Sequence, residues 1–357
     1  MKVGLVQRVL AGYRVPFFDM LADALQGELQ IFSGESRPNE MIDHSRIPVS
    51  AKVWPGKNLH LFSGKFYICL QLDILKWLKS WNPDILILEA NRRYPFSIAA
   101  ALWMRFRRRP VIGWGLGTGS TFDVSQRWFL RLFDALITYS SAGAEAYRAA
   151  GFSSDRIFIA KNAAAPRPQG NMPQRAYTPN WEKSPILLYV GRLQERKRVD
   201  LLIRACSVLE ESFHPILWIV GDGPVREQLV EISAECFPET VFWGALYNQS
   251  LKEKFDHADL FVLPGTGGLA IQQAMASGLP VIAAEADGTQ NDLIRSDNGV
   301  LIRAGDLDHL VQTIRNLLSD PIRLRKMGEA SFRIVHDEIN LESMTGTFIE
   351  AIHSVKA

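Results

Sequence analysis

The sequence has few cysteines and no long uncharged apolar segment. The three cysteines, Cys69, Cys206 and Cys236, lie far apart and lack the spacing of a metal site or a redox motif, which is typical of a reducing compartment. No stretch reaches the roughly 18 apolar residues that a membrane-spanning helix needs. The first residues, MKVGLVQRVL, show no signal-peptide pattern. These absences favour a cytoplasmic location.

Two kinds of binding motif are also missing. No strand is followed by G-x-G-x-x-G with the acidic residue that a dinucleotide site requires, which argues against a dehydrogenase. No segment is similar to a nucleic-acid-binding module, so we expect no nucleic-acid partner. What remains is a globular composition, with 47% hydrophobic and 22% charged residues, in a chain of 357 residues. That length predicts two domains.

The formal net charge of +2 conceals a difference between the two halves of the chain. Residues 1–180 contain 23 Lys and Arg against 13 Asp and Glu, whereas residues 181–357 contain 17 against 25. A basic half joined to an acidic half indicates two domains with different partners.

Proline-rich sequence without periodicity marks the boundary between these halves. We expect an N-terminal domain over residues 1–165, a linker over 166–183 and a C-terminal domain over 184–340. The last segment, 341–357, is expected to be a helix that could pack back on the N-terminal domain.

Short apolar runs alternate with amphipathic segments in both halves. In the first half, the runs 3–6, 29–32, 85–88, 110–114, 135–139 and 157–160 predict strands, and 15–25, 66–81 and 94–106 predict helices. Uninterrupted apolar strands such as 85–88 are typical of a parallel sheet that is covered on both faces. The sequence therefore predicts two doubly wound, Rossmann-like α/β domains.

Two further features of the first half could shape a binding site. Residues 34–64 lack periodicity, which predicts loops or a hairpin insertion beside an acceptor site. Glu89 and Asn91 follow the strand 85–88, at the carboxyl end where ligands bind in open α/β sheets. A ligand-binding role and an ordinary surface loop are both open for these two residues.

Arginines border apolar residues in segment 97–110, SIAAALWMRFRRRP. The four arginines are Arg105, Arg107, Arg108 and Arg109, and the segment 127–133, RWFLRLF, repeats the pattern. Such a surface favours an anionic membrane, at roughly 1 kcal/mol per basic side chain. The alternative is a core helix whose basic end suits the helix dipole. Because the whole half is basic, we interpret it as the side that meets a membrane or a phosphorylated acceptor.

The stretch 258–285, ADLFVLPGTGGLAIQQAMASGLPVIAAE, predicts a strand, a Gly-rich loop, a helix and a second strand. Gly265, Gly267 and Gly268 allow the backbone of the loop to turn sharply and to approach a ligand closely. The helix that follows offers free N–H groups and the positive end of its dipole, which suits a phosphate. For the glycines alone, a tight connection that binds nothing is an equal alternative.

Cations upstream favour the binding interpretation. Arg192 follows the apolar strand 186–190 and Gly191, and Lys197 lies across the next turn, before a helix. At the carboxyl end of a strand, such a pair can hold a diphosphate, with Arg as a bidentate fork and Lys as a point charge. Alone, these cations would more often belong to a solvated turn.

Several segments of the second half together resemble one family. They are the strand followed by GRL-x-x-x-K-x-VD, the GDGP turn, the F-x-G strand and PG-x-GGLAIQQAMASGLPVIA. This pattern resembles family 4 of the retaining, nucleotide-sugar-dependent glycosyltransferases, over roughly residues 185–318. The resemblance implies the GT-B fold, in which two Rossmann-like domains face each other across a cleft. It implies a nucleotide-sugar site on the C-terminal domain and an acceptor site on the N-terminal one.

The resemblance also implies roles for particular residues. Arg192 and Lys197 would hold the donor diphosphate and stabilise it as the leaving group, and the amides of Gly267, Gly268 and Leu269 would assist them. No metal or other cofactor is implied, because the two cations can do a metal's work. The remaining residues expected at the nucleotide-sugar site are Gly191, Gly265, Thr266, Gln273, Gly244, Asp222, Gly12 and Tyr13.

The chain departs from the family pattern at three places. Family members usually carry two glutamates eight positions apart, and Gly265 and Gln273 stand there in this chain. Gln273 can still hydrogen-bond ribose hydroxyls. The family's histidine in the N-terminal domain is absent, and Trp114 and Gly115 occupy that place. Its double glycine after the first strand is reduced to Gly12, followed by Tyr13 and Arg14.

Three hypotheses follow from these patterns. The leading one is a retaining glycosyltransferase that moves a sugar to a lipid-linked or saccharide acceptor in cell-envelope or polysaccharide assembly, peripheral to the inner face of the membrane. The missing glutamates also allow a subunit that binds a sugar nucleotide or a partner transferase without turnover. A GT-B enzyme of another type, such as a sugar-nucleotide epimerase, is the third.

Overall fold

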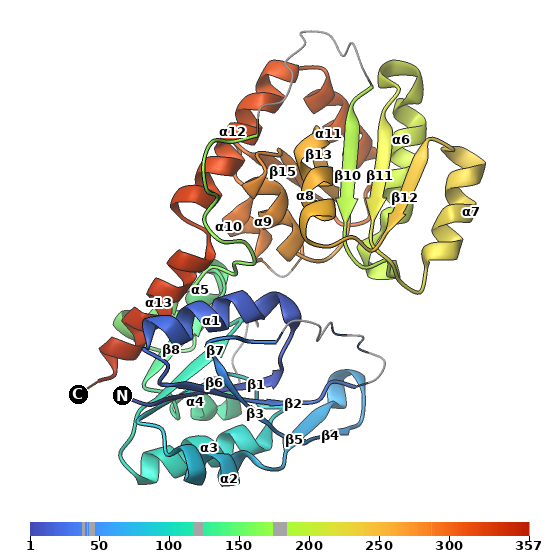
Figure 1. Cartoon of the computed structure of the whole chain (residues 1–357). Helices are drawn as coiled ribbons and strands as arrows, with labels where there is room; N and C mark the ends of the chain where they lie inside the picture. The colour runs from blue at the N-terminus through green and yellow to red at the C-terminus, as the bar shows by residue number, and fades with distance from the viewer. Residues whose placement is uncertain are drawn as a thin grey trace. The chain divides into compact units, whose positions relative to one another are not determined.

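The computed structural model describes residues 1–37, 40, 42, 47–117, 124–173, 184–286 and 288–356. These residues form two compact units, coloured from blue to red along the chain in Figure 1. The first unit comprises Met1–Asn162 and Leu341–Ala357, and the second comprises Ala163–Asn340. Of the expected linker 166–183, residues 174–183 lie outside the described residues.

A parallel sheet forms the centre of the first unit, in the order β3-β2-β1-β6-β7-β8-β9. Helices cover both faces of this sheet (Figure 1). The strands are β1 (Val3–Val9), β2 (Leu29–Gly34), β3 (Lys52–Pro55), β6 (Ile85–Glu89), β7 (Val111–Gly115), β8 (Ala135–Thr138) and β9 (Ile157–Ile159). The helices are α1 (Val15–Ala24), α2 (Ile74–Trp81), α3 (Pro95–Phe106), α4 (Val124–Leu130), α5 (Ser141–Ala149) and α13 (Leu341–Ser354).

The last helix, α13, packs against α1 in the core of the first unit. The ring centroid of Phe348 lies 4.8 Å from that of Phe17 and 4.9 Å from that of Trp114. All three rings are buried. Aromatic pairs at such distances stabilise a core beyond the area they bury, so the first unit is completed by the end of the chain.

The second unit is built on a parallel sheet in the order β12-β11-β10-β13-β14-β15. Its strands are β10 (Ile186–Val190), β11 (Ile216–Val220), β12 (Thr240–Gly244), β13 (Leu260–Leu263), β14 (Val281–Ala284) and β15 (Gly299–Ile302). Its helices are α6 (Val199–Phe213), α7 (Arg226–Cys236), α8 (Asn248–His257), α9 (Leu269–Ala276), α10 (Gln290–Leu293), α11 (Leu307–Leu318) and α12 (Pro321–Asp337). The prediction of two doubly wound α/β domains is confirmed.

One predicted helix is wrong in its first part. Residues 66–81 were expected to be helical throughout, but Ile68–Gln71 is a strand, β5, and α2 begins only at Ile74. β5 pairs antiparallel with β4 (Asn58–Leu61). Residues 68–71 alternate between half-buried and buried positions, the period of a strand. A hairpin, one of the two alternatives for residues 34–64, is therefore present, but its second strand lies beyond that segment, within the predicted helix.

Candidate functional site

The Gly-rich loop after β13 is packed on the turn after β10. These two strands are neighbours in the sheet, so their carboxyl ends lie side by side. A Cβ atom on Gly265 would lie 2.3 Å from the carbonyl oxygen of Arg196 and 2.5 Å from the Cα of Lys197. Only a glycine fits at position 265, because the backbone of the neighbouring turn fills the space of a side chain.

The side chain of Lys197 extends into the same loop. Its Nζ donates a hydrogen bond to the carbonyl oxygen of Thr266, and a Cβ on Gly267 would lie 2.3 Å from that nitrogen. Gly267 has a φ of +140°, a conformation that glycine favours. Arg196 makes two hydrogen bonds with Thr266. The Arg196 Nη1 donates to the Thr266 Oγ1 at 2.9 Å, and the Thr266 N–H donates to the Arg196 carbonyl oxygen at 3.0 Å. Loop and turn thus enclose one ammonium group.

The environment of Lys197 favours an anionic ligand. Burial, with the nearby charge of Arg196, lowers the pKa of Lys197 from its ordinary value of 10.5 to about 8. Among the described residues, no carboxylate lies within ion-pair distance of its Nζ. An anion bound beside it would favour the charged form and raise this pKa again.

Arg192 and the start of α9 lie at the same edge of the sheet. Arg192 is partly buried in the turn after β10, and its carbonyl oxygen accepts a hydrogen bond from Tyr189 Oη at 3.2 Å. Helix α9 begins at Leu269. The first amides of a helix have no intrahelical acceptor and carry the positive end of the dipole. The amides of Gly267, Gly268 and Leu269 therefore provide donors beside the Lys197 ammonium.

Glycines also connect the carboxyl ends of β10, β11 and β12. A Cβ on Gly221 would lie 1.9 Å from the carbonyl oxygen of Gly191, and the Gly221 N–H donates to Gly244 at 2.8 Å. Asp222 is exposed, and its Oδ1 accepts a hydrogen bond from the N–H of Gly223 at 2.7 Å. Three residues expected at the site thus shape this edge.

The remaining expected residues lie on α9 and in the first unit. Gln273 is half-buried on α9. Gly12 and Tyr13 belong to the first unit, where they form the turn between β1 and α1 with Arg14.

Two buried glutamines of the second unit were not found from the sequence. Gln290 is 1% exposed. Its Nε2 donates a hydrogen bond to the carbonyl oxygen of Gly267 at 2.7 Å, which connects α10 to the Gly-rich loop. Gln272 is fully buried, accepts a hydrogen bond from the N–H of Ala165 at 2.8 Å and donates to the carbonyl of Ile339 at 2.6 Å. Helical spacing could have identified Gln272, because it precedes the buried Met275 by three residues.

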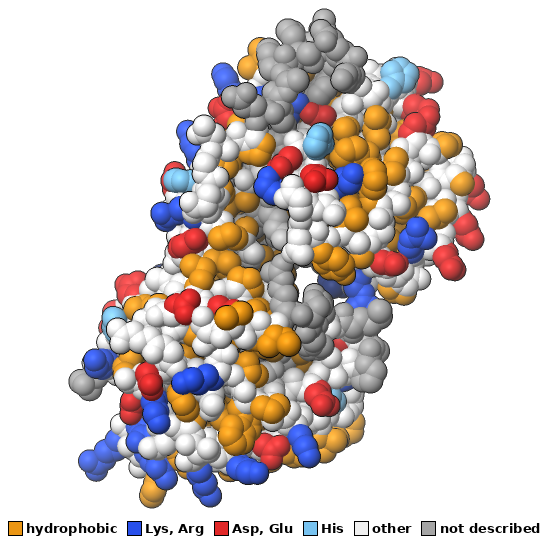
Figure 2. All heavy atoms as spheres, in the orientation of Figure 1, with side chains coloured by type: hydrophobic (Ala, Val, Ile, Leu, Met, Phe, Trp, Pro, Cys, Tyr) orange, Lys and Arg blue, Asp and Glu red, His pale blue; other side chains and the backbone are white. Residues whose placement is uncertain are grey.

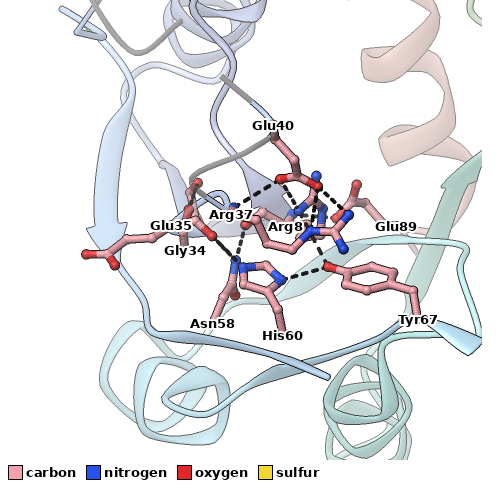
Figure 3. A network of polar contacts seen from close by, with 10 residues as sticks. Arg8, Gly34, Glu35, Arg37, Glu40, Asn58, His60, Tyr67 and Glu89 are labelled. Carbon is pink, nitrogen blue, oxygen red and sulfur yellow. Dashed lines mark hydrogen bonds and ion pairs between the residues drawn. The ribbon is translucent and has the colours of Figure 1, made fainter. Parts of the chain in front are cut away.

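A second polar cluster lies at the carboxyl ends of β1 and β6 in the first unit (Figure 3). Glu40 is at its centre and accepts hydrogen bonds from Arg8 Nη1 at 2.8 Å and from Arg37 Nη2 at 3.0 Å. Burial alone would raise the pKa of Glu40, but the two guanidinium groups outweigh it and lower the pKa to about 2. The Tyr67 hydroxyl continues the network, 3.5 Å from Arg8 Nη1 and 2.8 Å from His60 Nδ1.

Glu89 closes the other side of this cluster. Its Oε2 accepts a hydrogen bond from the backbone N–H of Arg8 at 2.5 Å. Burial raises the pKa of Glu89 from 4.5 to about 7, although the Arg8 N–H and the charges of Arg8 and Arg14 act against it. Glu89 is therefore half-buried in a polar cluster and not in an ordinary surface loop, and its ligand-binding role stays a prediction.

The raised pKa of Glu89 predicts a pH-dependent stability. Between pH 4.5 and about 7 the folded chain binds a proton that the unfolded chain does not, so stability falls as pH rises through this range. Glu89→Gln keeps an acceptor for the Arg8 N–H but cannot ionise. We expect it to stabilise the fold at pH 8 by on the order of 2 kcal/mol and to have little effect at pH 4.5. Melting curves of both proteins across this range test this, and parallel pH profiles would contradict it.

The sequence matches the family model for glycosyl transferases group 1 over residues 173–333. A GDP-mannose-dependent alpha-mannosyltransferase of Mycobacterium tuberculosis is 31% identical over 292 residues, which are 74% of this chain and 74% of the relative. A GDP-mannose-dependent monoacylated alpha-(1-6)-phosphatidylinositol monomannoside mannosyltransferase of Corynebacterium glutamicum is 30% identical over 46% of this chain and 45% of the relative.

The fold of the whole chain also has solved counterparts. The structure of Anabaena Alr3699/HepE in complex with UDP has a TM-score of 0.74 to this one at 17% identity, over 99% of this chain and 100% of that chain. The chain spans between 29% and 74% of the length of the first curated relatives that it matches.

The chain belongs to the group 1 glycosyl transferases, family 4, and has the GT-B fold. The mannosyltransferases among these relatives are GDP-mannose-dependent, so their donor is a nucleotide sugar. In the described part of the chain, no helix is long and apolar enough to cross a membrane.

Proposed function

We propose that this enzyme transfers a sugar from a nucleoside-diphosphate sugar to a lipid-linked or saccharide acceptor in cell-envelope or polysaccharide assembly. In this proposal the second unit holds the donor diphosphate between the Lys197 ammonium, the Arg192 guanidinium and the amides of Gly267, Gly268 and Leu269. The observation that carries it is the enclosure of the Lys197 Nζ by a glycine-rich loop at a helix start.

The chemistry follows from where charge develops. When the bond between the sugar and the diphosphate breaks, negative charge grows on the leaving phosphate. Fixed cations and amide dipoles aimed at that phosphate stabilise the transition state more than the ground state, and one such donor is typically worth about 3 kcal/mol. Gly191, Gly244 and Asp222 would shape the nucleotide side of the pocket, and Thr266 and Gln273 would face the sugar and ribose.

A donor screen tests this function. The purified protein is incubated with UDP-, GDP-, ADP- and dTDP-sugars, together with a membrane extract as acceptor source. We expect one donor to be consumed with release of its nucleoside diphosphate. A nucleotide that protects against melting while no donor is consumed would support the binding subunit instead, and interconversion of sugar isomers without acceptor would support an epimerase.

The acceptor proposal rests on the surface of the first unit. Lys and Arg side chains gather at the lower left of Figure 2. A groove of the first unit is lined by five cations and one carboxylate: Arg105, Arg108, Arg109, Arg156, Lys356 and Asp134. Exposed apolar side chains lie on two helices of this unit, with Phe106 at 91% and Leu102 at 49% exposure on α3 and Trp128 at 51% on α4. Cations beside exposed apolar groups suit an anionic lipid surface.

Charge reversal tests the membrane interaction. We expect the triple substitution of Arg105, Arg107 and Arg108 by Glu to abolish sedimentation with phosphatidylserine-containing vesicles, since each cation contributes about 1 kcal/mol near such a surface. Arg109 is left in place because its Nη1 donates to Asn82 Oδ1 at 2.8 Å and to the carbonyl of Pro83 at 2.7 Å.

The matched control carries the same charge change on the second unit. Arg204, Arg323 and Arg333 are exposed there, and their replacement by Glu should leave sedimentation nearly unchanged. Equal sedimentation of the two triple variants would rule out the proposed surface.

A further inference from the structure

Arg14 is a buried cation without a counterion in contact. It ends the turn after β1, at the start of α1, and is 5% exposed. Within the described ranges, no carboxylate lies within ion-pair distance of its guanidinium, and its hydrogen bond goes from Nη1 to the Sδ of Met344 at 3.8 Å. A thioether is a weak acceptor, whereas a guanidinium has five N–H donors. Burying such a charge without a partner is costly.

Aromatic rings enclose this guanidinium. Its Cζ lies 5.2 Å from the ring centroid of Tyr13, 5.1 Å from that of Trp114 and 5.2 Å from that of Tyr139. Cation–π contacts stabilise the charge but satisfy few of its N–H donors. Trp114 adds a further donor, because its Nε1 is buried and has no acceptor among the described residues.

One acidic group, Glu89, acts on Arg14 without fully balancing its charge. Glu89 interacts with it electrostatically across the sheet edge, but burial raises the pKa of Glu89 to about 7. At neutral pH this carboxyl group is therefore only partly ionised. Its Oε2 is also already bonded to the Arg8 N–H.

We infer that Arg14 binds an oxyanion, a phosphate or a carboxylate, carried by the acceptor substrate. This inference rests on the proposed function, and it assigns the acceptor to the anionic class. A guanidinium fork matches both groups bidentately. The position suits substrate, because ligands of open α/β sheets bind at the carboxyl ends of the strands. The aromatic cage holds the fork in place before the anion arrives, which reduces the entropic cost of binding.

The test is an anion titration followed by thermal unfolding at constant ionic strength. All proteins carry Lys197→Ala, so that the proposed donor site does not contribute a response. The probes are inorganic phosphate and glucuronate, which distinguish the two sources of the oxyanion. We expect saturable stabilisation by at least one probe, and a half-saturating concentration at least about tenfold higher when Arg14→Met is added.

Two further variants keep the test decisive. Arg14→Lys retains the charge without the fork and should bind the probe with intermediate affinity. Arg333→Met removes an exposed arginine of the second unit, outside the basic groove, and should behave as the parent. Should Arg14→Met fail to fold, the comparison of Arg14→Lys with Arg333→Met decides. An unchanged response in the Arg14 variants, or no response to either probe in the parent, overturns the inference.

A separate measurement distinguishes this inference from the proposed function. Stabilisation by nucleoside diphosphates is recorded with Lys197 intact. If no nucleotide stabilises the wild-type protein, the proposed function fails whatever the phosphate titration gives. If Arg14→Met removes the nucleotide response itself, Arg14 serves the donor and the acceptor inference is overturned.

Discussion

Lys197→Ala is expected to lower kcat/KM for sugar transfer by about 100- to 1000-fold, and Arg192→Ala is expected to lower it by nearly as much. We expect this because the ammonium stabilises the departing phosphate. The Lys197 Nζ is bonded to the loop at the Thr266 carbonyl, whereas Arg196 bonds the Thr266 hydroxyl from an exposed position. The loss should appear in kcat at saturating donor, because the interaction strengthens in the transition state.

The pH dependence of kcat/KM also tests the role of Lys197. Because the pKa of Lys197 in the empty site is about 8, kcat/KM should fall as pH rises through this value and the ammonium is lost. Lys252→Ala is the matched control, since Lys252 is an exposed lysine on α8 paired with Asp256. A Lys197→Ala enzyme that turns over within threefold of the Lys252→Ala enzyme would contradict the assigned role.

Gly265→Glu is expected to inactivate the enzyme, although it restores the residue that the family usually carries. The Cβ of any side chain at 265 would lie 2.3 Å from the Arg196 carbonyl oxygen and 2.5 Å from the Lys197 Cα. Because backbone atoms must then move, we expect a loss of stability of about 1–3 kcal/mol and displacement of the Lys197 ammonium from the loop. Gly265→Ala should show the same effects. It adds a Cβ atom without a carboxylate, so its loss of stability and activity would be due to steric crowding and not to charge.

The other family glutamate provides the control for this prediction. Gln273 is half-buried on α9 and already carries a side chain of nearly the same size as that of Glu, so the substitution adds no atoms to the site. Gln273→Glu should therefore change the free energy of unfolding by no more than about 0.5 kcal/mol, as an ordinary surface substitution does. Wild-type activity in Gly265→Glu would show that the loop and the turn are not packed as described.

The fold could be predicted from the sequence because its apolar runs, its glycine positions and its helical periodicity all indicated the same elements. Apolar runs bounded by glycines, such as the one ending at Gly191, have the length and composition of buried parallel strands, and the segments between them have helical period. It failed at residues 68–71, where the spacing of Ile68 and Leu72 also fits a helix and only pairing with β4 decides. Nonlocal strand pairing overrode the local signal there.

The candidate site was only partly accessible to the same reasoning. Spacing brought Arg192, Lys197 and the glycines together, because carboxyl ends of adjacent strands must meet. It could not show that Gly265 is required by the Arg196 backbone, or that Gln290 supports the loop, since both depend on contacts between segments distant in sequence. Arg14 was noted only as a residue beside Tyr13, because burial without a counterion has no local sequence signal.

The most direct measurement is a crystal structure of the protein with the nucleoside diphosphate that stabilises it most. The account predicts phosphate oxygens within hydrogen-bond distance of Lys197 Nζ, of the Arg192 guanidinium and of at least one amide among Gly267, Gly268 and Leu269. A bound nucleotide whose phosphates lie away from this loop, with the Lys197 ammonium still on the Thr266 carbonyl, would contradict it.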